Sequence, residues 1–523
     1  MISYVPVPPR RPVKFISNAR RRQNGEARKH SHMEASLKTI LDGLAVIASS
    51  GSLDRTITFL ATDSRRVGPG CLFFALPGES TDGSFFIEEA IDRGATAVVT
   101  EQARRPHPGV ALIRVPDARL AMAQAARRFY GCPDESLMLC GITGARGKST
   151  VAHLLKHLLD TGGRRAGLIG SITYDLGSRT VPSFRTTPDA VELSGLLGQM
   201  RGAGVKEAAI EINGAGLRQK SVFELQWRVG VFLNSPVAGD PEELPDQDES
   251  ARVRGFFSGE TGPPPETAVI CADDPLGCEL IAALPDSVRK VSFGTGADAE
   301  FRAVRVVPDS DSTRITLAWP GGETEILLPM VGEPNAANFV AAAAAAYAMG
   351  RDPATFGRAM AEFPGVPGRM ERIDGGQAFY VFVDHGHTAN RLSATLDALR
   401  KVIQGRILVV FGCGGNRDRA ARAEVVERIQ DRADFVWATA DNTRGESLER
   451  IFADMEKGVT DSGRIAFVAD RREAIRRAFE QAADGDCVLL AGKGNESFLE
   501  MGDTLLPFDD RMVARELLAL LKT

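Results

Sequence analysis

At 523 residues the chain is too long for a single hydrophobic core, and a usual size of ~150 residues per domain predicts about three domains. Its composition is 43% hydrophobic and 25% charged, with a formal net charge of -5. This balance gives no electrostatic reason to expect nucleic acid or an anionic membrane as the main partner, so a small-molecule ligand is the default expectation.

The first segment, residues 1–32, differs from the rest because it carries eight Lys or Arg residues against one acid, Glu26. It lacks the hydrophobic stretch that a signal peptide requires. We expect a disordered, solvated tail or a misassigned leader ahead of Met33, with a basic arm that contacts nucleic acid or lipid headgroups as the alternative. No apolar run approaches the ~20 residues of a membrane span, and the alanine-rich "VAAAAAAYAMG" (340–350) is too short. The seven cysteines are scattered without CxxC spacing, which favours a reducing cytoplasm.

Short apolar strands alternate with helical patterns from about residue 55 to 135, which predicts a small α/β unit. The run "LMLCGIT" (137–143) then indicates a buried strand. Further on, "STVAHLLKHLLDTGG" places Val151, Leu154, Leu155 and Leu158 on one helical stripe, and "AGLIGSI" indicates the next strand. Strand, tight loop, helix and strand form the βαβ frame in which a glycine-rich loop binds phosphate.

The loop itself, "GARGKST" (144–150), has the composition of a phosphate cradle. Its small residues allow successive backbone N–H groups to face an anion, and the following helix adds its positive end. Lys148 would reach the outer phosphates, and the hydroxyls of Ser149 and Thr150 are candidate Mg²⁺ ligands. The strict GxxxxGK[ST] spacing fails at Ile142. A glycine-rich turn that binds nothing is therefore the alternative.

Two later regions stand out. Residues 236–265 are acidic and rich in Pro and Gly, which predicts a long excursion over the surface. A third unit begins near "PGVPGRMERI" and three times runs an apolar strand into a polar loop, in "RILVVFGCGGNRDR", "ADFVWATADNTRGE" and "DCVLLAGKGNES". Ligands of parallel sheets gather at the carboxyl ends of the strands, so we expect these loops to converge on one crevice.

The segment "GITGARGKST" is similar to the "GITGTNGKTT" loop of the Mur ligases. Further segments follow in that family's order, namely "RTTPDAVEL", "AAIEINGAGL", "GEPNAANFVAA", "PGRMERI", "VDHGHTANRL", "FGCGGNRDR", "DNTRGE", "GKGNE" and "PFDDR". The resemblance covers roughly residues 50–520. It is strongest to the branch that adds the third amino acid of the peptidoglycan stem peptide.

The resemblance implies an α/β fold with the three-domain Mur ligase architecture. A UDP-substrate domain would occupy 33–136, a central P-loop ATPase-like domain with a parallel sheet 137–365, and a C-terminal Rossmann-like, amino-acid-binding domain 366–523. It also implies a cytoplasmic ligase that uses ATP and Mg²⁺. The family transfers the γ-phosphate of ATP to a substrate carboxylate, here that of UDP-N-acetylmuramoyl-L-alanyl-D-glutamate, and an amine attacks the acyl phosphate.

Position by position, the resemblance implies three groups of site residues. ATP and its metal would be held by Gly144, Gly147, Lys148, Ser149, Thr150, Glu211, Asn335, Arg369, Asp384 and His387, with Ser149 and Glu211 on Mg²⁺ and with Lys148 and Glu211 catalytic. The UDP-muramoyl substrate would contact Ser64, Thr186 and Thr187. The added amino acid would contact Arg422, Asp441, Asn442, Arg444, Gly492 and Glu496. The branch that adds diaminopimelate has "DNPR" where this chain has "DNTR", and lysine-adding relatives lack the arginine, so diaminopimelate is favoured.

Several residues of the family's phosphoryl-transfer centre are replaced. The metal-binding histidine of "EVSSHG" is Ala215, the Asp-His pair of "NLTRDHLDYH" is absent from "NSPVAGDPEE", and the lysine that becomes carbamylated is matched by Arg252. The loop's usual Asn is Arg146, and a histidine is replaced by Asn495. Arg146 and Arg252 are candidates to bind phosphate in place of a metal ion, which makes Arg252 a catalytic candidate. Two hypotheses stay open: a divergent ligase, with a ligase redirected to another acid and amine as an intermediate version, and a protein that binds nucleotide or muramoyl peptide without efficient ligation.

Overall fold

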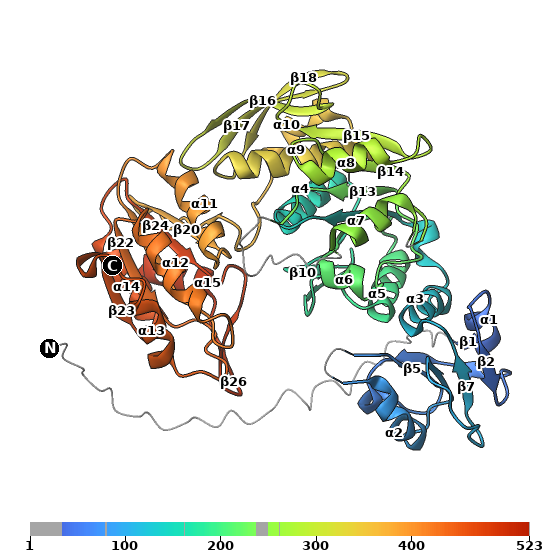
Figure 1. Ribbon diagram of the computed structural model, residues 1–523. Coiled ribbons are helices and arrows are strands. Elements are labelled where there is room, and N and C mark those ends of the chain that lie inside the picture. Colours follow the sequence, from blue (N-terminus) through green and yellow to red (C-terminus); the bar gives the residue numbers. More distant parts are fainter. Residues whose placement is uncertain (1–33, 79–80, 162, 237–248, 261, 522–523) are drawn as a thin grey trace.

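The computed structural model describes residues 34–78, 81–161, 163–236, 249–260 and 262–521, so the predicted basic tail lies outside the described residues. Three α/β units follow one another along the chain, here called the N-terminal, central and C-terminal units. In Figure 1 they run from blue, through green and yellow, to orange and red. The α/β class and the parallel central sheet that the sequence predicted are confirmed.

The N-terminal unit is a five-stranded sheet in the order β2-β7-β6-β5-β4, in which β2 is antiparallel to β7. Its strands are β2 (Ala48–Ser50), β4 (Phe59–Ala61), β5 (Cys71–Ala75), β6 (Ala97–Thr100) and β7 (Ala111–Arg114), and β1 (Ala35–Ser36) pairs separately with β3 (Thr56–Ile57). Its α-helices are α1 (Leu37–Leu41), α2 (Ile87–Asp92) and α3 (Ala118–Phe129). Apolar clusters cover both faces of the sheet, which explains why β5 and β6 are almost continuously apolar.

The central unit is an 11-stranded sheet in the order β11-β10-β9-β12-β8-β13-β14-β15-β16-β17-β18. Its middle is parallel, and the hairpin strands at both edges are antiparallel. The strands are β8 (Met138–Thr143), β9 (Gly167–Ile169), β10 (Thr173–Asp175), β11 (Thr180–Pro182), β12 (Glu207–Glu211), β13 (Val229–Phe232), β14 (Thr267–Cys271), β15 (Arg289–Gly294), β16 (Phe301–Pro308), β17 (Thr313–Trp319) and β18 (Gly322–Leu328).

Helices cover both faces of this central sheet. One face carries α4 (Lys148–Asp160), α9 (Glu333–Ala348) and α10 (Phe356–Met360), and the other carries α5 (Ala190–Gly202), α6 (Gly214–Arg218), α7 (Glu249–Ser258) and α8 (Pro275–Ala283). The predicted stripe on α4 is fully buried, and the alanine run belongs to α9, where small side chains allow α4 to pack closely alongside. Among the described residues, no helix combines the length and apolar character that crossing a bilayer requires.

Helix α7 corrects one sequence prediction. Residues 249–258 fall inside the predicted surface excursion, yet Val253, Phe256 and Phe257 are buried against the central sheet. The Pro- and Gly-rich composition of the whole stretch hid a short helix whose apolar side chains are spaced to face the core. Residues 237–248 and 261 lie outside the described part of the chain.

The C-terminal unit is a six-stranded sheet in the order β19-β20-β24-β21-β22-β23, parallel except for β19. Its strands are β19 (Glu371–Arg372), β20 (Tyr380–Asp384), β21 (Ile407–Phe411), β22 (Phe435–Thr439), β23 (Ile465–Val468) and β24 (Cys487–Ala491), followed by the hairpin β25 (Phe498–Met501) and β26 (Thr504–Pro507). Helices α11 (Ala389–Arg400), α12 (Ala420–Gln430) and α13 (Leu448–Glu456) cover one face, and α14 (Arg471–Gln481) and α15 (Asp510–Leu520) the other.

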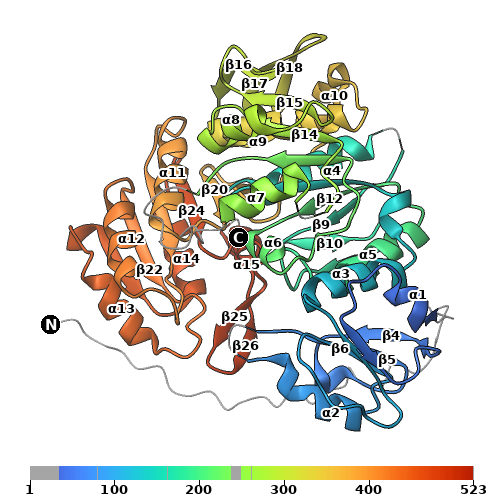
Figure 2. The same ribbon diagram turned by 45° about the vertical axis from the view of Figure 1, so that its right-hand side comes forward.

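The units touch at defined places. Helix α3 of the N-terminal unit packs along α5 of the central unit, as both ribbon views show, and Lys220 forms an ion pair with Asp117 beside this contact. The C-terminal unit meets the central unit through Lys401 with Glu333 at 2.8 Å. In Figure 2 the central unit lies at the upper right, with the C-terminal unit to its left and the N-terminal unit below it.

Candidate functional site

The phosphate loop lies between β8 and α4, as the sequence predicted. Gly144 and Gly147 have φ angles of 134° and 85°, a region that residues with a Cβ rarely adopt. At Gly147 a Cβ would also lie 2.3 Å from Oδ1 of Asn338. The Lys148 ammonium turns back onto the loop and donates to the carbonyls of Gly144 (2.5 Å) and Ala145 (3.1 Å). The loop is thus compact, and Lys148 begins α4.

Two backbone amides of the loop are directed away from any ligand. The N–H groups of Ala145 and Arg146 donate to the backbone carbonyl and to Oδ1 of Asn234, at 3.0 and 2.9 Å. The expectation that successive loop amides face an anion is therefore wrong for these two residues. The first turn of α4, which contains Ser149 and Thr150, is the part left to bind an anion, because its amides have no partner inside the helix.

Glu211 ends β12, the strand beside β8, and its carboxylate is only 1% exposed. Its Oε2 accepts a hydrogen bond from Oγ of Ser149 (2.9 Å), and its Oε1 accepts one from the N–H of Ser171 (3.0 Å). A Cβ at Gly170 would lie 2.0 Å from Oε1, so a larger residue there would displace the Glu211 carboxylate. Burial raises the pKa of Glu211, and the charge of Lys148 opposes that rise. A cation beside this carboxylate would relieve its desolvation.

Ser149 and Glu211 fit the predicted role of Mg²⁺ ligands. They bring a hydroxyl and a carboxylate oxygen within 2.9 Å of each other, and Mg²⁺ typically binds one or two carboxylates together with water and substrate phosphate. Among the residues that the structure describes, no group of three or more His, Cys, Asp or Glu side chains is arranged to hold a metal. Arg252 lies on α7, which packs against α6, and its catalytic role stays a prediction.

The predicted nucleotide contacts come from two units. Asn335 lies in the first turn of α9, and its amide donates to a backbone carbonyl four residues earlier (2.9 Å). Arg369, in the C-terminal unit, donates to Oδ1 of Asn495 (3.0 Å). Burial lowers the pKa of Arg369, while the carboxylates of Asp384 and Glu211 act in the opposite direction. Because Glu211 belongs to the central unit, Arg369 lies at the junction where the C-terminal unit faces the phosphate loop.

Asp384 and His387 shape the loop that follows β20. Each carboxylate oxygen of Asp384 accepts one backbone N–H, at 2.8 Å. His387 has its Nε2 3.2 Å from a guanidinium nitrogen of Arg417 and its Nδ1 2.8 Å from the carbonyl of His385. A guanidinium has no acceptor, so Nε2 must accept and the ring proton resides on Nδ1. Burial lowers the pKa of His387, in keeping with a neutral ring.

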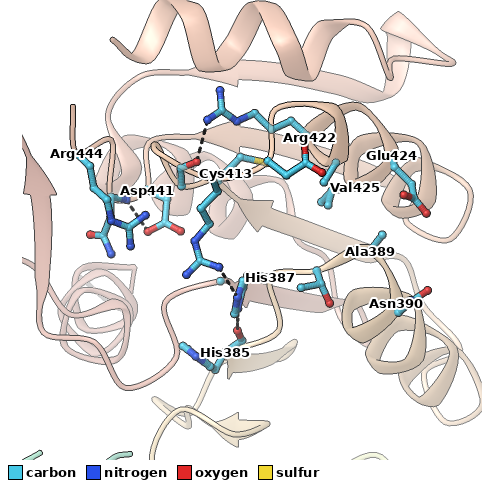
Figure 3. Close-up of a pocket in the computed structure, with 18 of the residues that line it drawn as sticks. His385, His387, Ala389, Asn390, Cys413, Arg422, Glu424, Val425, Asp441 and Arg444 are labelled. Carbon is cyan, nitrogen blue, oxygen red and sulfur yellow. Dashed lines mark hydrogen bonds between the residues drawn. The ribbon is translucent and has the colours of Figure 1, made fainter. Parts of the chain in front are cut away.

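A cavity of about 270 Å³ opens at the carboxyl ends of the C-terminal strands (Figure 3). The loops after β21, β22 and β24 all line it, which confirms their predicted convergence. The residues predicted for the amino-acid site all line this cavity, namely Arg422, Asp441, Asn442, Arg444, Gly492 and Glu496. Arg422 and Glu496 are 74 positions apart in the sequence. They line the same cavity because β24, β21 and β22 are neighbours in the sheet.

Arg422 has partners that the sequence did not predict. Its side chain is 2% exposed and forms ion pairs with Glu446 (2.7 Å) and Asp454 (3.1 Å). It lies in the first turn of α12 and its guanidinium joins that helix to the segment after β22. With two carboxylates already beside it, its charge is compensated within the protein.

Arg417 is the residue that the sequence argument missed. It lines the same cavity, and a Cβ at Gly414 would lie 3.0 Å from Nη1 of Arg444 and 3.4 Å from Nε of Arg417. Two guanidinium groups therefore lie over Gly414. The signal was available: Arg417 stands in the polar loop directly after β21, whereas Arg422 stands inside the following helix.

Negative charge also lines this cavity. Oε2 of Glu496 accepts hydrogen bonds from the fully buried Lys493 (3.0 Å) and from the amide of Asn442 (2.8 Å), and Asp441 lies 3.6 Å from the same ammonium. Two carboxylates thus share one lysine. A cavity with paired guanidiniums and excess carboxylate suits a ligand that carries both carboxylate and ammonium groups.

A second cavity, of about 440 Å³, lies between the N-terminal and central units. Thr186 and Thr187, for which the resemblance implied substrate contacts, line it, and that role stays a prediction. Oγ1 of Thr187 donates to the backbone carbonyl of Glu211 (2.9 Å), which places this cavity beside the phosphate loop. Ser64 lies outside the lining, and its buried hydroxyl donates to Glu89 (2.9 Å).

Three family models match successive parts of the chain. They are the Mur ligase family catalytic domain over residues 56–130, the Mur ligase middle domain over 142–346, and the Mur ligase glutamate ligase domain over 368–494.

Known proteins resemble the chain over most of its length. UDP-N-acetylmuramoyl-L-alanyl-D-glutamate--2,6-diaminopimelate ligase from Solibacter usitatus is 37% identical over 88% of this chain and 93% of its own, and that from Gloeobacter violaceus is 38% identical over 89% and 94%. A solved structure of a ligase with this name has a TM-score of 0.67 at 27% identity, covering 94% of this chain and all of its own. MurF ligase from Thermotoga maritima, solved with ADP, has a TM-score of 0.55 at 18% identity, and the match covers 88% of this chain and 96% of that one. This likeness concerns the fold alone.

Proposed function

The chain belongs to the Mur ligase family, and on that premise we propose that it joins UDP-N-acetylmuramoyl-L-alanyl-D-glutamate to 2,6-diaminopimelate at the expense of ATP, in peptidoglycan synthesis. The observation that carries the proposal is the cavity lined by the guanidiniums of Arg417 and Arg444 and the carboxylates of Asp441 and Glu496, because these charges match a zwitterionic amino acid. The seven cysteines are free thiols, which supports a place in the reducing cytoplasm.

The reaction requires two displacements. The glutamyl carboxylate attacks the γ-phosphorus of ATP, so that an acyl phosphate forms and ADP leaves. The amine of diaminopimelate then attacks the acyl carbon, an amide bond forms, and phosphate and a proton are released. Both steps move negative charge between oxygen atoms, so catalysis depends mainly on alignment and charge stabilisation.

Residues of the central and C-terminal units contact different parts of the nucleotide. The first turn of α4 binds phosphate oxygens, and Lys148 provides a charge that reaches the transferred phosphoryl group. Arg369 adds positive charge from the C-terminal unit, and its burial keeps water away from the acyl phosphate. Asn335 from the central unit and His387 from the C-terminal unit contact the nucleotide, and His387 also lines the amino-acid cavity. Mg²⁺ would be held by Ser149 and Glu211, where it would neutralise phosphate charge.

The amino-acid cavity selects the amine. Arg417 and Arg444 hold the carboxylate at the far end of diaminopimelate, whereas the resemblance had placed Arg422 and Arg444 among the residues that contact this amino acid. Asp441 and Glu496 hold the ammonium group of that same end, with Asn442 and the backbone of Gly492 beside them. The amine at the other end of diaminopimelate is thereby left free of these contacts, as its attack on the acyl phosphate requires.

The direct test is to incubate the full chain with ATP, Mg²⁺, the UDP-muramoyl dipeptide and diaminopimelate. We expect phosphate release that requires all four components, and a product whose mass is the sum of acid and amine less one water. Binding of ATP and muramoyl dipeptide without any product would identify the chain as a binding protein on the ligase fold. That outcome would fit the replacements at Ala215, Arg252 and Asn495 and would overturn the proposal.

Arg417→Gln is expected to raise the KM for diaminopimelate by about 10- to 100-fold, because a charge-assisted bond to carboxylate contributes about 1.5–3 kcal/mol. Steady-state kinetics with diaminopimelate and with lysine as the amine provide the measurement. Lysine lacks the second carboxylate, so its weaker use should be unchanged.

The matched control is Arg419→Gln, which removes an exposed arginine two residues away that pairs with Asp454 (2.8 Å). This variant should retain the KM of the unaltered protein. An equal rise of KM for diaminopimelate and lysine in Arg417→Gln would contradict the assigned role.

A further inference from the structure

The cavity between the N-terminal and central units contains an arginine that the assigned roles leave unused. Arg185 lines it directly before Thr186 and Thr187, and Arg119 lines it from α3 of the N-terminal unit. The Arg119 guanidinium donates to the carbonyl of Pro77 (2.6 Å). The side chain of Arg185 is 58% exposed. Of the two, Arg185 is the one whose charge is available to a ligand.

The backbone of Arg185 is held unusually firmly for an exposed residue. The hydroxyl of Tyr174, whose side chain is buried, donates to the carbonyl of Arg185 (2.6 Å) and accepts from its N–H (3.1 Å). Two residues later, Thr187 donates to the carbonyl of Glu211 (2.9 Å) and accepts from the N–H of Asn213 (3.0 Å). The loop is therefore anchored on both sides of Thr186. The backbone of Arg185 is thus held in a fixed position beside the phosphate loop.

The nearest acid does not neutralise Arg185 fully. Asp189 lies 3.4 Å from Nη1 of Arg185, and this is the single ion pair of Arg185 within the described residues. The other oxygen of Asp189 accepts the N–H of Glu192 and so caps α5 (3.0 Å). Such a long, exposed contact is weak. Arg185 can exchange it for a ligand carboxylate in bidentate geometry.

We propose that Arg185 binds the carboxylate of the acceptor's terminal glutamate that is not phosphorylated, and so makes the site specific for an acceptor ending in a dicarboxylic amino acid. The inference rests on the proposed function. The carboxylate to be activated must reach Lys148 and Glu211, and Thr187 joins the Arg185 loop to the backbone of Glu211. The other carboxylate of the same glutamyl residue then lies on the Arg185 side of the cavity. There the guanidinium of Arg185 can donate hydrogen bonds to it.

The test measures binding by calorimetry without ATP, using two ligands: UDP-N-acetylmuramoyl-L-alanyl-D-glutamate and the same molecule with its α-carboxylate converted to a carboxamide. We expect the unaltered protein to bind the acid about 10-fold more tightly than the amide, as charge-assisted bonds of this kind predict. Arg185→Gln should weaken binding of the acid about 10-fold and leave binding of the amide unchanged. Arg185→Lys keeps the charge but loses the bidentate donor geometry of the guanidinium. Its affinity for the acid should lie between that of the unaltered protein and that of Arg185→Gln.

Arg179→Gln is the matched control, because Arg179 begins the same hairpin region but donates to Gln199 (2.7 Å) outside the cavity. It should behave as the unaltered protein does with both ligands. If the unaltered protein binds acid and amide equally, or if Arg185→Gln weakens both to the same extent, the inference is overturned while the proposed function stands. If the unaltered protein binds neither ligand, the proposed function fails together with it.

Discussion

Lys148→Ala is expected to lower the rate of ATP-dependent amide formation by at least about 1000-fold while the protein stays folded. Removal of one preorganised donor to developing charge costs about 10²–10³ in rate, and here the donor also carries a full charge at the transferred phosphoryl group. The loop should keep its shape, because Asn234 holds it through backbone bonds and Gly147 packs against Asn338. Phosphate release under saturating substrates gives the rate, and calorimetry with an ATP analogue shows whether the nucleotide still binds.

Lys156→Ala provides the comparison, because Lys156 lies on the same helix and pairs with Asp160 (2.6 Å) and Asp175 (3.2 Å). It has the same side chain and a similar local backbone, but its ammonium is committed to these acids. The turnover of this variant should stay within about twofold of the unaltered protein, since the Lys156 ammonium is paired with Asp160 and Asp175 and does not act on the nucleotide. A Lys148→Ala rate within tenfold of the original would show that Lys148 does not act on the transferred group.

Patterns along the chain predicted those features that depend on local spacing. The buried stripe on α4 follows from a helical period, and the cavity in the C-terminal unit follows from polar loops after neighbouring parallel strands. Family resemblance then supplied roles for residues such as Asp441 and Glu496. The domain boundaries after 136 and 365 stay predictions.

Features that depend on tertiary contacts could not be predicted in this way. Arg417 and Arg422 are five residues apart in one polar segment, and only packing against Glu446 and Asp454 shows that Arg422 faces inward. The diversion of two loop amides likewise depends on Asn234, 88 residues beyond Arg146. A sequence pattern carries no information on such long-range partners.

A buried ion pair joins the two loops that carry most of the amino-acid site. Arg471 and Asp510 have side chains that are 0% exposed, and they form two bonds of 2.8 and 2.7 Å. The same guanidinium donates to the carbonyls of Ala440 (3.4 Å) and Ala491 (2.9 Å), which directly precede the site loops after β22 and β24. Arg471 therefore ties the position of both loops to α14 and α15.

Arg471→Met is expected to lower the free energy of unfolding by about 3–5 kcal/mol, because it leaves the carboxylate of Asp510 buried without a partner. It should also raise the KM for diaminopimelate, because the carbonyls before both site loops lose their donor. Urea denaturation and steady-state kinetics test the two effects. The neighbouring Arg472→Met removes an exposed arginine paired with Glu516 (2.7 Å), and it should cost less than about 1 kcal/mol.

The double variant Arg471→Met, Asp510→Leu separates the two roles of this pair. Removing both charges ends the desolvation penalty, so much of the lost stability should return, as it does when buried ion pairs are replaced by apolar side chains. The KM should nevertheless stay high, because methionine cannot donate to the carbonyls of Ala440 and Ala491. If instead the double variant recovers both stability and KM, the guanidinium does not hold the site loops, and the pair serves only the core of the C-terminal unit.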